Sequence, residues 1–118
     1  MTAVTDDRRA GGELWVTWSE GAVLVLLVGQ LTDDDAIRLK RRLSALVDLD
    51  VEEVVVDCAG VRWMSDAVLH ALADVARTVR TEGGVDAELV VVDPPPDLGV
   101  RLRDRGIGTA SHRLGVPA

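Results

Sequence analysis

The sequence predicts a single α/β domain, with helices packed against a mixed β-sheet that opens with an N-terminal β-hairpin. Three patterns indicate this class: two adjacent β-favouring runs, amphipathic helical periods that follow them, and short apolar runs between the helices. The order is strand, strand, helix, strand, helix, strand, helix. Strands joined through a helix are expected to be parallel, because such crossovers are right-handed. The antiparallel hairpin then makes the sheet mixed.

The length of 118 residues suits one domain, and no internal repeat or long linker divides it. We expect a flexible N-terminal segment over residues 1–12, the folded domain over 13–108 and a C-terminal tail over 109–118. The tail is short of apolar period, so we expect it to be loosely held.

The hairpin is predicted from residues 13–19 and 22–28, which the short Glu20-Gly21 connection joins. A first helix should follow, because Thr32 and Asp35 have the spacing of a capping box. Its apolar positions recur at helical spacing: Ala36, Leu39, Leu43, Leu46 and Val47.

Residues 53–58 form a nearly continuous apolar run, as expected of a central strand that is covered on both faces. An Ala59-Gly60 turn and residues 61–64 should then lead to Ser65, a good N-cap for the next helix. That helix carries a stripe of period 3.6: Val68, Leu69, Leu72, Val75, Ala76 and Val79.

Gly83-Gly84 should end this second helix. A further buried strand is predicted over 87–92, and the run Asp93-Pro94-Pro95-Pro96 should close it. The last helix is expected over 97–105, stopping at Gly106.

Charge and hydropathy exclude several classes of function. The formal charge of −7 and the pI near 4.7 argue against a nucleic-acid binder, which needs a basic surface facing phosphates. The basic cluster Arg38, Lys40, Arg41 and Arg42 is interpreted as a solvated helix face. No apolar run is long enough to cross a bilayer, and the charged N-terminus does not resemble a secretory signal. We therefore expect a cytoplasmic protein without membrane insertion.

The residues that carry chemistry form no catalytic set, so we predict no enzyme activity, no cofactor and no metal. Cys58 ends a buried strand and should behave as a small hydrophobe. His70 and His112 have no placed partners. Asp57 ends a strand as in a receiver domain, but the chain opens with a hairpin, and its single lysine, Lys40, precedes the last strand.

The tryptophans are candidate contact residues. Trp15 and Trp18 should lie on opposite faces of the first strand by the period-2 rule. Trp63 immediately precedes the second helix start and is either an exposed anchor for a partner or a partial cover of the core.

From Gly29 to about residue 108 the chain resembles the STAS domain family, shared by bacterial anti-sigma factor antagonists and the cytoplasmic ends of sulphate transporters. Gly29-Gln30-Leu31-Thr32 is similar to the family's Gly-Glu-Leu-Asp stretch, and residues 54–61 are similar to its strand with Asp-Leu-Ser-Gly-Val. Where the family has Asp-Ser-Ser/Thr-Gly-Leu after an aromatic and an aliphatic residue, this chain has Ser65-Asp66-Ala67-Val68-Leu69 after Trp63 and Met64.

In the antagonists of this family, a kinase-type anti-sigma factor phosphorylates the serine that follows the aspartate, and the unphosphorylated form binds that factor. Without a gap, the family's aspartate aligns with Ser65 and its serine with Asp66, so the two residue types are exchanged. Three interpretations stay open: Asp66 is a fixed mimic of the phosphorylated state, Ser65 has become the acceptor, or neither is a switch and the surface docks constitutively.

The resemblance implies a non-enzymatic regulator in a partner-switching network, an anti-sigma factor antagonist or a degenerate relative of one, with a serine-kinase-type anti-sigma factor as partner. The alternative is an accessory subunit that docks on a membrane transporter of the lipid-transport ABC type. The phosphorylation-site region is Ser65 and Asp66. The expected contacts, with the first helix beside them, are Trp63, Met64, Ser65, Asp66, Ala67, Leu69 and His70.

Overall fold

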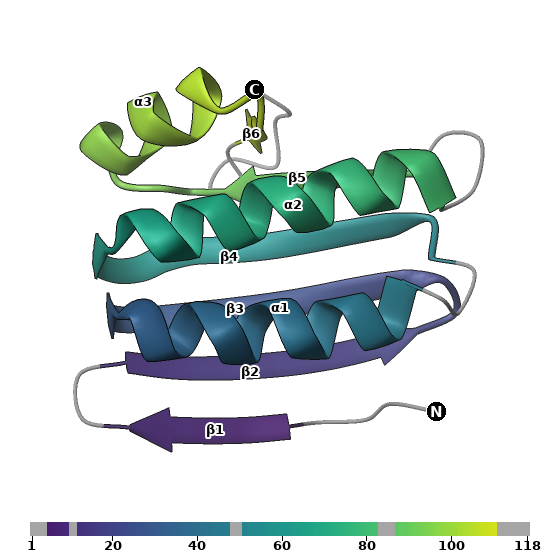
Figure 1. Ribbon diagram of the computed structural model, residues 1–118, viewed down its shortest axis with the longest axis horizontal. Helices are drawn as coiled ribbons and strands as arrows, with labels where there is room; N and C mark the ends of the chain where they lie inside the picture. Colours follow the sequence, from purple (N-terminus) through teal and green to yellow (C-terminus); the bar gives the residue numbers. More distant parts are fainter. Residues whose placement is uncertain (1–4, 10–11, 48–50, 83–86, 111–118) are drawn as a thin grey trace.

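The structure is a computed structural model that describes residues 5–9, 12–47, 51–82 and 87–110. The elements are β1 (Thr5–Arg9), β2 (Gly12–Ser19), β3 (Ala22–Leu31), α1 (Asp33–Val47), β4 (Glu53–Met64), α2 (Asp66–Glu82), β5 (Glu88–Val92), α3 (Pro96–Asp104) and β6 (Gly108–Ala110). The strands form one sheet in chain order, antiparallel from β1 to β3 and parallel from β3 to β6. Helices α1 and α2 lie side by side over one face (Figure 1). The predicted α/β class with a mixed sheet is confirmed.

The predicted hairpin between β2 and β3 is also confirmed. Its two turn residues, Glu20 and Gly21, have φ angles of 48° and 85°. Two successive left-handed residues make the tight turn whose twist matches that of paired strands. The strand that follows is longer than predicted, because β3 continues to Leu31.

The first helix begins as the capping-box pattern predicts. The Thr32 backbone N–H donates to Asp35 Oδ2 at 2.7 Å, and the Ala36 N–H donates to the Thr32 carbonyl at 3.2 Å. Ala36, Leu39 and Leu43 are buried against the sheet. The side chains of Leu46 and Val47 lie outside the described residues.

The Ala59-Gly60 turn is a wrong prediction, since β4 continues through it to Met64. Against β3, the strand carries an extra residue twice: Leu26 pairs with Asp57 but Val28 with Gly60, and the register shifts again before Gln30. These bulges break the period of two that a regular strand would keep. Gly60 suits the first one, because a Cβ there would approach the Val28 side chain to 3.3 Å.

The central position of β4 is confirmed, because it lies between β3 and β5. Its expected cover on both faces is wrong. Val54, Val56 and Cys58 are buried on the side that faces the helices, whereas Val55 on the other side is partly exposed. On that open face of the sheet, Leu24 and Leu26 are 49% and 36% exposed.

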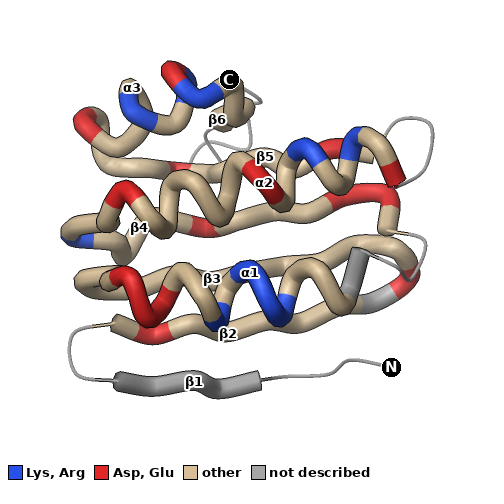
Figure 2. Tube along the Cα trace, viewed as in Figure 1, with Lys and Arg blue, Asp and Glu red and all other residues tan. Residues whose placement is uncertain are grey.

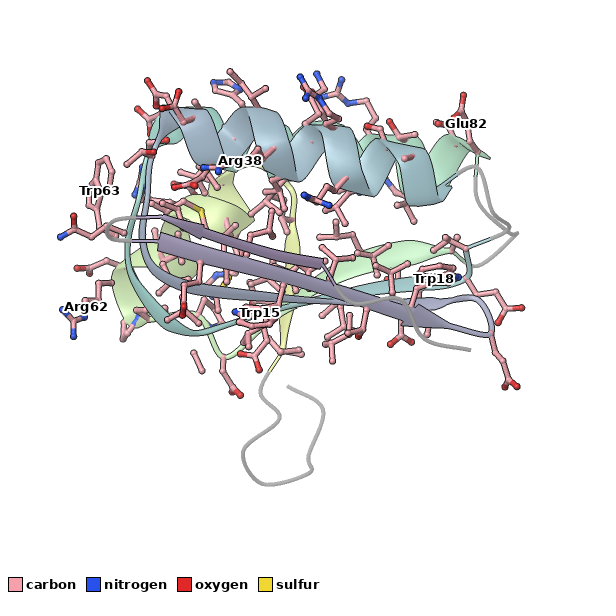
Figure 3. All side chains as sticks on the ribbon, turned by 90° about the horizontal axis from the view of Figure 1, so that it is seen from below. Trp15, Trp18, Arg38, Arg62, Trp63 and Glu82 are labelled. Atoms are coloured by element: carbon pink, nitrogen blue, oxygen red, sulfur yellow. The ribbon has the colours of Figure 1, made fainter. Side chains whose placement is uncertain are left out.

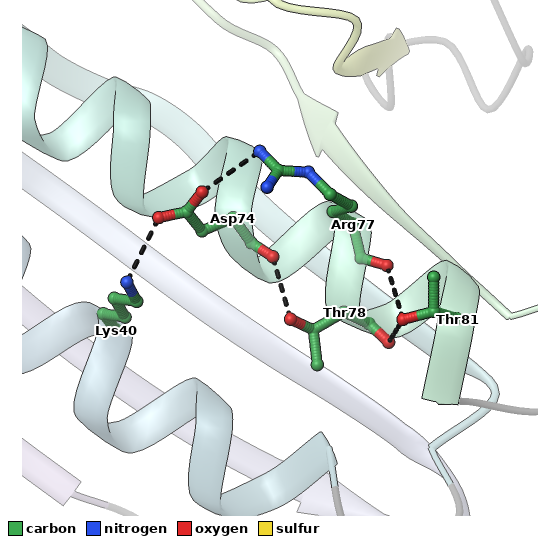
Figure 4. Close-up of polar contacts among 5 residues, drawn as sticks. All are labelled: Lys40, Asp74, Arg77, Thr78 and Thr81. Carbon is green, nitrogen blue, oxygen red and sulfur yellow. Dashed lines mark hydrogen bonds and ion pairs between the residues drawn. The ribbon is translucent and has the colours of Figure 1, made fainter.

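The second helix buries its predicted stripe in full: Val68, Leu69, Leu72, Val75, Ala76 and Val79. It is tied to α1 by Asp74, which accepts from Lys40 Nζ and from Arg77 Nη2, both at 3.1 Å (Figure 4). Within the basic cluster of α1, Lys40 thus has a partner on the neighbouring helix. The predicted stop at Gly83-Gly84 lies outside the described residues.

The two edges of the sheet contain strands that the sequence patterns did not predict. Residues 5–9, expected within a flexible segment, form β1 and pair with β2. Residues 108–110 form β6 and pair with β5, which corrects the predicted loose tail at residues 109 and 110. The rest of that tail, with His112, lies outside the described residues. These two segments are strands because each pairs with a neighbouring strand, and no pattern in their own sequences indicates this.

The tryptophans of β2 lie on opposite faces, as predicted. Trp18 packs against the core on the side of the helices, whereas Trp15 lies on the other side of the sheet (Figure 3). The core therefore fills the layer between the sheet and the two long helices, and the open face remains without a covering helix among the described elements.

Cys58 is fully buried, at 0% exposure, and this burial determines the ionisation of its thiol. Burial, aided by the negative charge of Asp57, raises the pKa of the thiol to about 12. Since an unfolded cysteine ionises near pH 8.5–9, the unfolded state loses this proton at a lower pH than the folded state. Unfolding therefore becomes more favourable as the pH rises between the two values.

We expect the free energy of unfolding to fall between about pH 9 and pH 12, with Cys58 contributing at most about 1.4 kcal/mol per pH unit. Urea denaturation at several pH values, for the wild type and Cys58→Ala, would measure it. The chain has no tyrosine to add to this slope. Equal slopes for both proteins would contradict the assignment.

Candidate functional site

The candidate site lies where two parallel strands end and two helices begin. Leu31 and Met64 pair at the ends of β3 and β4. The Ser65 N–H donates to the Leu31 carbonyl at 3.0 Å, which holds the start of α2 level with the start of α1. Both helices begin at the same end of the sheet (Figure 1).

Ser65 is the N-cap of α2, as predicted. Its Oγ accepts from the Val68 N–H at 3.3 Å, and its carbonyl accepts from the Val68 and Leu69 N–H groups at 3.1 and 3.2 Å. The residue is only 6% exposed. Its hydroxyl is therefore a buried part of the helix start.

Asp66, by contrast, is exposed and paired with two arginines at the end of α3. Arg101 Nη2 donates to Asp66 Oδ1 at 2.7 Å, and Arg105 Nη2 lies 3.7 Å from the same oxygen. Arg101 Nη1 also donates to the Met64 carbonyl at 3.0 Å. The hydrogen bond from Arg101, with the charges of Arg101, Arg105 and His70, holds the pKa of Asp66 below its ordinary value.

These two arginines were not among the residues that the sequence patterns singled out. Arg101 and Arg105 are four residues apart on the last predicted helix, so they share one face of it. That spacing was the available signal. Their partner is 35 residues away from Arg101 in the chain, and no local pattern links the two.

Trp63 is the exposed aromatic residue of the site. Its side chain is 52% exposed and projects from the end of the sheet, near Arg62 (Figure 3). It lines an open hollow together with Thr32, Asp33 and Asp34 at the start of α1. Of the two interpretations of Trp63, this exposure favours the contact anchor over the core cover.

Three of the predicted contact residues are buried in the structure: Met64, Leu69 and Ser65, the last as the N-cap described above with 6% exposure. Met64 is 1% exposed, because the second bulge of β4 turns it into the core, and Leu69 is 0% exposed, because it belongs to the buried stripe of α2. Ala67 is partly buried and His70 is exposed. We define the junction surface by the accessible members of the predicted set, Trp63, Asp66, Ala67 and His70.

Acidic residues gather at the helix starts beside this surface. Asp33, Asp34 and Asp35 form the first turn of α1, and Asp66 begins α2 (Figure 2). Carboxylates at helix N-termini are favoured by the helix dipole. Asp35 is further compensated by Arg38 Nη2 at 2.7 Å from its Oδ1.

Among the described residues, no group of histidine, cysteine or acidic side chains has the arrangement of a metal site. In the same part of the chain, no helix is both long and apolar enough to span a membrane.

Comparisons with known proteins agree with this architecture. A family model described as STAS domain matches residues 16–108. A search of curated proteins gives no match.

Several solved structures share the fold at low sequence identity. The Bacillus cell fate determinant SpoIIAA in its phosphorylated form is 12% identical with a TM-score of 0.68, covering 92% of this chain and 90% of its own. An anti-sigma factor antagonist from Mycobacterium paratuberculosis is 18% identical with a TM-score of 0.67, and the match covers 86% of this chain and 87% of that protein. A variant of RsbS from Moorella thermoacetica is 15% identical with a TM-score of 0.65, and the match covers 84% of this chain and 86% of that protein.

Replacing the N-cap should destabilise the domain measurably. Ser65→Ala removes the hydroxyl that accepts from the Val68 N–H and leaves only the Ser65 carbonyl as its acceptor, so we expect a loss of about 1 kcal/mol in the free energy of unfolding. Urea denaturation followed by circular dichroism would measure it. Ser44→Ala, at an exposed position inside α1, is the matched control and should change stability by less than about 0.5 kcal/mol. Equal effects of the two substitutions would contradict the capping role.

Proposed function

The chain belongs to the STAS domain family, and on this premise we propose that it is a regulatory interaction domain of the anti-sigma factor antagonist type. Its partner is a kinase-type anti-sigma factor, which docks on the junction surface. The observation that carries the proposal is the half-exposed Trp63, which shares an open hollow with Asp33 and Asp34 at the end of the sheet where both long helices begin. An exposed tryptophan next to charged groups is typical of a protein contact.

The state of the chemically capable side chains supports binding rather than catalysis. The Cys58 thiol is buried and its pKa is raised, so little thiolate exists at neutral pH. The Ser65 hydroxyl is occupied at the helix start. His70 is a single exposed imidazole on α2. None of these groups is combined with a second one in the way that general acid–base or nucleophilic catalysis requires.

The structural neighbours support the choice of partner. They include an anti-sigma factor antagonist and a form of SpoIIAA that is phosphorylated, so proteins of this fold take part in regulation through anti-sigma factors and phosphate. The alternative, an accessory subunit on a membrane transporter, finds no support in these comparisons, and we do not propose it.

The structure bears on the three interpretations of the exchanged residues. Ser65 is an unfavourable phosphate acceptor, because it is 6% exposed and a kinase would have to open the first turn of α2 to reach its hydroxyl. Asp66 is the exposed residue at the position that aligns with the family's serine. Two interpretations therefore keep support: a fixed charge that imitates phosphorylation, or a surface that docks constitutively.

Removing the aromatic anchor should weaken the complex. For Trp63→Ala we expect an affinity at least about tenfold lower, since a buried aromatic residue at an interface centre often contributes about 2 kcal/mol or more. Isothermal titration calorimetry with each purified kinase-type anti-sigma factor of the same genome would measure it. Leu24→Ala is the matched control, because Leu24 is 49% exposed but lies on the open face of the sheet.

Two results would count against the proposal, and a third would count only against the conclusion that Ser65 is an unfavourable phosphate acceptor. If none of these anti-sigma factors binds the wild type, the proposed function fails. A loss of affinity in Leu24→Ala but not in Trp63→Ala would move the interface to the open face. Phosphate incorporation from ATP that disappears in Ser65→Ala would show that Ser65 is an acceptor after all.

A further inference from the structure

Helix α3 reaches the junction surface through Arg101 and through Arg105, which follows it by one turn. Arg101 bonds both to the Asp66 carboxylate, at 2.7 Å, and to the Met64 carbonyl, at 3.0 Å. It therefore joins the end of β4 and the start of α2 to a third element. Arg105 adds a second positive charge 3.7 Å from the same carboxylate oxygen.

We propose that α3 is part of the docking surface and that Arg101 of this helix and Arg105, its C-cap, cancel the charge of Asp66, so that the partner binds without any change of charge at position 66. This inference rests on the proposed function and specifies how that surface is regulated. Of the two remaining interpretations, it favours a surface that docks constitutively over an Asp66 that imitates a phosphorylated serine.

Covering an ionised group with a partner costs free energy. A partner that packs over Asp66 must remove water from its carboxylate, which is unfavourable unless a cation stays beside it. Here the cations come from the chain itself. The side chains of Arg101 and Arg105 are 39% and 30% exposed, against 73% for Asp66, so the arginines are the better fixed members of the group.

The same balance of charge separates Asp66 from a phosphorylated serine. A phosphoserine carries about −1.5 to −2 charge and three acceptor oxygens. The aspartate carries −1 and faces two guanidinium groups, with His70 as a further positive contribution when it is protonated. A partner thus meets no net negative charge at position 66.

The test is a double-mutant cycle between position 66 and the arginines. The variants are Arg101→Gln/Arg105→Gln, which replaces both charges by neutral polar groups, Asp66→Asn, and the triple combination. Arg103→Gln is the matched control, an exposed arginine of the same helix outside the described contacts of Asp66. The probe is the anti-sigma factor that binds the wild type, titrated calorimetrically at low ionic strength.

We expect the double glutamine variant to bind about tenfold more weakly, because it leaves an uncompensated carboxylate in the interface. Asp66→Asn added to it should restore the affinity to within about twofold of the wild type. Arg103→Gln alone should change the affinity by less than about twofold, whereas Asp66→Asn alone, which leaves two uncompensated guanidinium groups in the interface, should also bind more weakly than the wild type. Arg101→Lys/Arg105→Lys, which retains both charges, should stay close to the wild type.

Unchanged or tighter binding by the double glutamine variant would overturn the inference. So would a triple variant as weak as the double one, because the arginines would then act only by holding α3. Carboxyl NMR on the protein without a partner tests the charge balance independently: Asp66 should titrate at a lower pH in the wild type than in the double variant. Equal titration of Asp66 in the two proteins would overturn the cancellation of charge, whether or not an anti-sigma factor binds. Failure of every anti-sigma factor to bind would instead defeat the proposed function.

Discussion

The register between β3 and β4 is the constraint on which the rest of the structure depends. Two extra residues in β4 bring Met64 level with Leu31, and the hydrogen bond from Ser65 to the Leu31 carbonyl then places the start of α2 beside that of α1. A slip by one residue would exchange the two faces of the strand. The helices, the core and the exposed end of the sheet all follow from this one pairing.

The bulges also divide the residues of β4 between the core and the surface. Val61 and Met64 are buried although they are three apart, a spacing that a regular strand would place on opposite faces. Trp63, between them, is turned outward at the end of the sheet. The irregularity that closes the core on one side therefore leaves an exposed aromatic residue on the other.

At the junction itself, the neighbouring residues Ser65 and Asp66 have opposite roles. Ser65 is drawn inward because a hydroxyl can satisfy the free N–H groups at a helix start. Asp66, one position later, faces solvent, and its closest charge partner is Arg101 of α3, an element distant in the chain. The chemistry of position 66 is thus a property of three elements, β4, α2 and α3, rather than of a motif.

Local signals in the sequence were sufficient for the hairpin turn at Glu20-Gly21, for both helix caps and for the buried stripe of α2, because each depends on neighbours within a few residues. Only the tertiary structure decided the continuity of β4, the edge strands β1 and β6 and the inward position of Met64, since these depend on pairing between strands. Leu69 was misplaced although its stripe was recognised, because the family resemblance put it on the surface and packing put it in the core. The pairing of Asp66 with Arg101 joins residues 35 positions apart, a contact that only the docking of α3 creates.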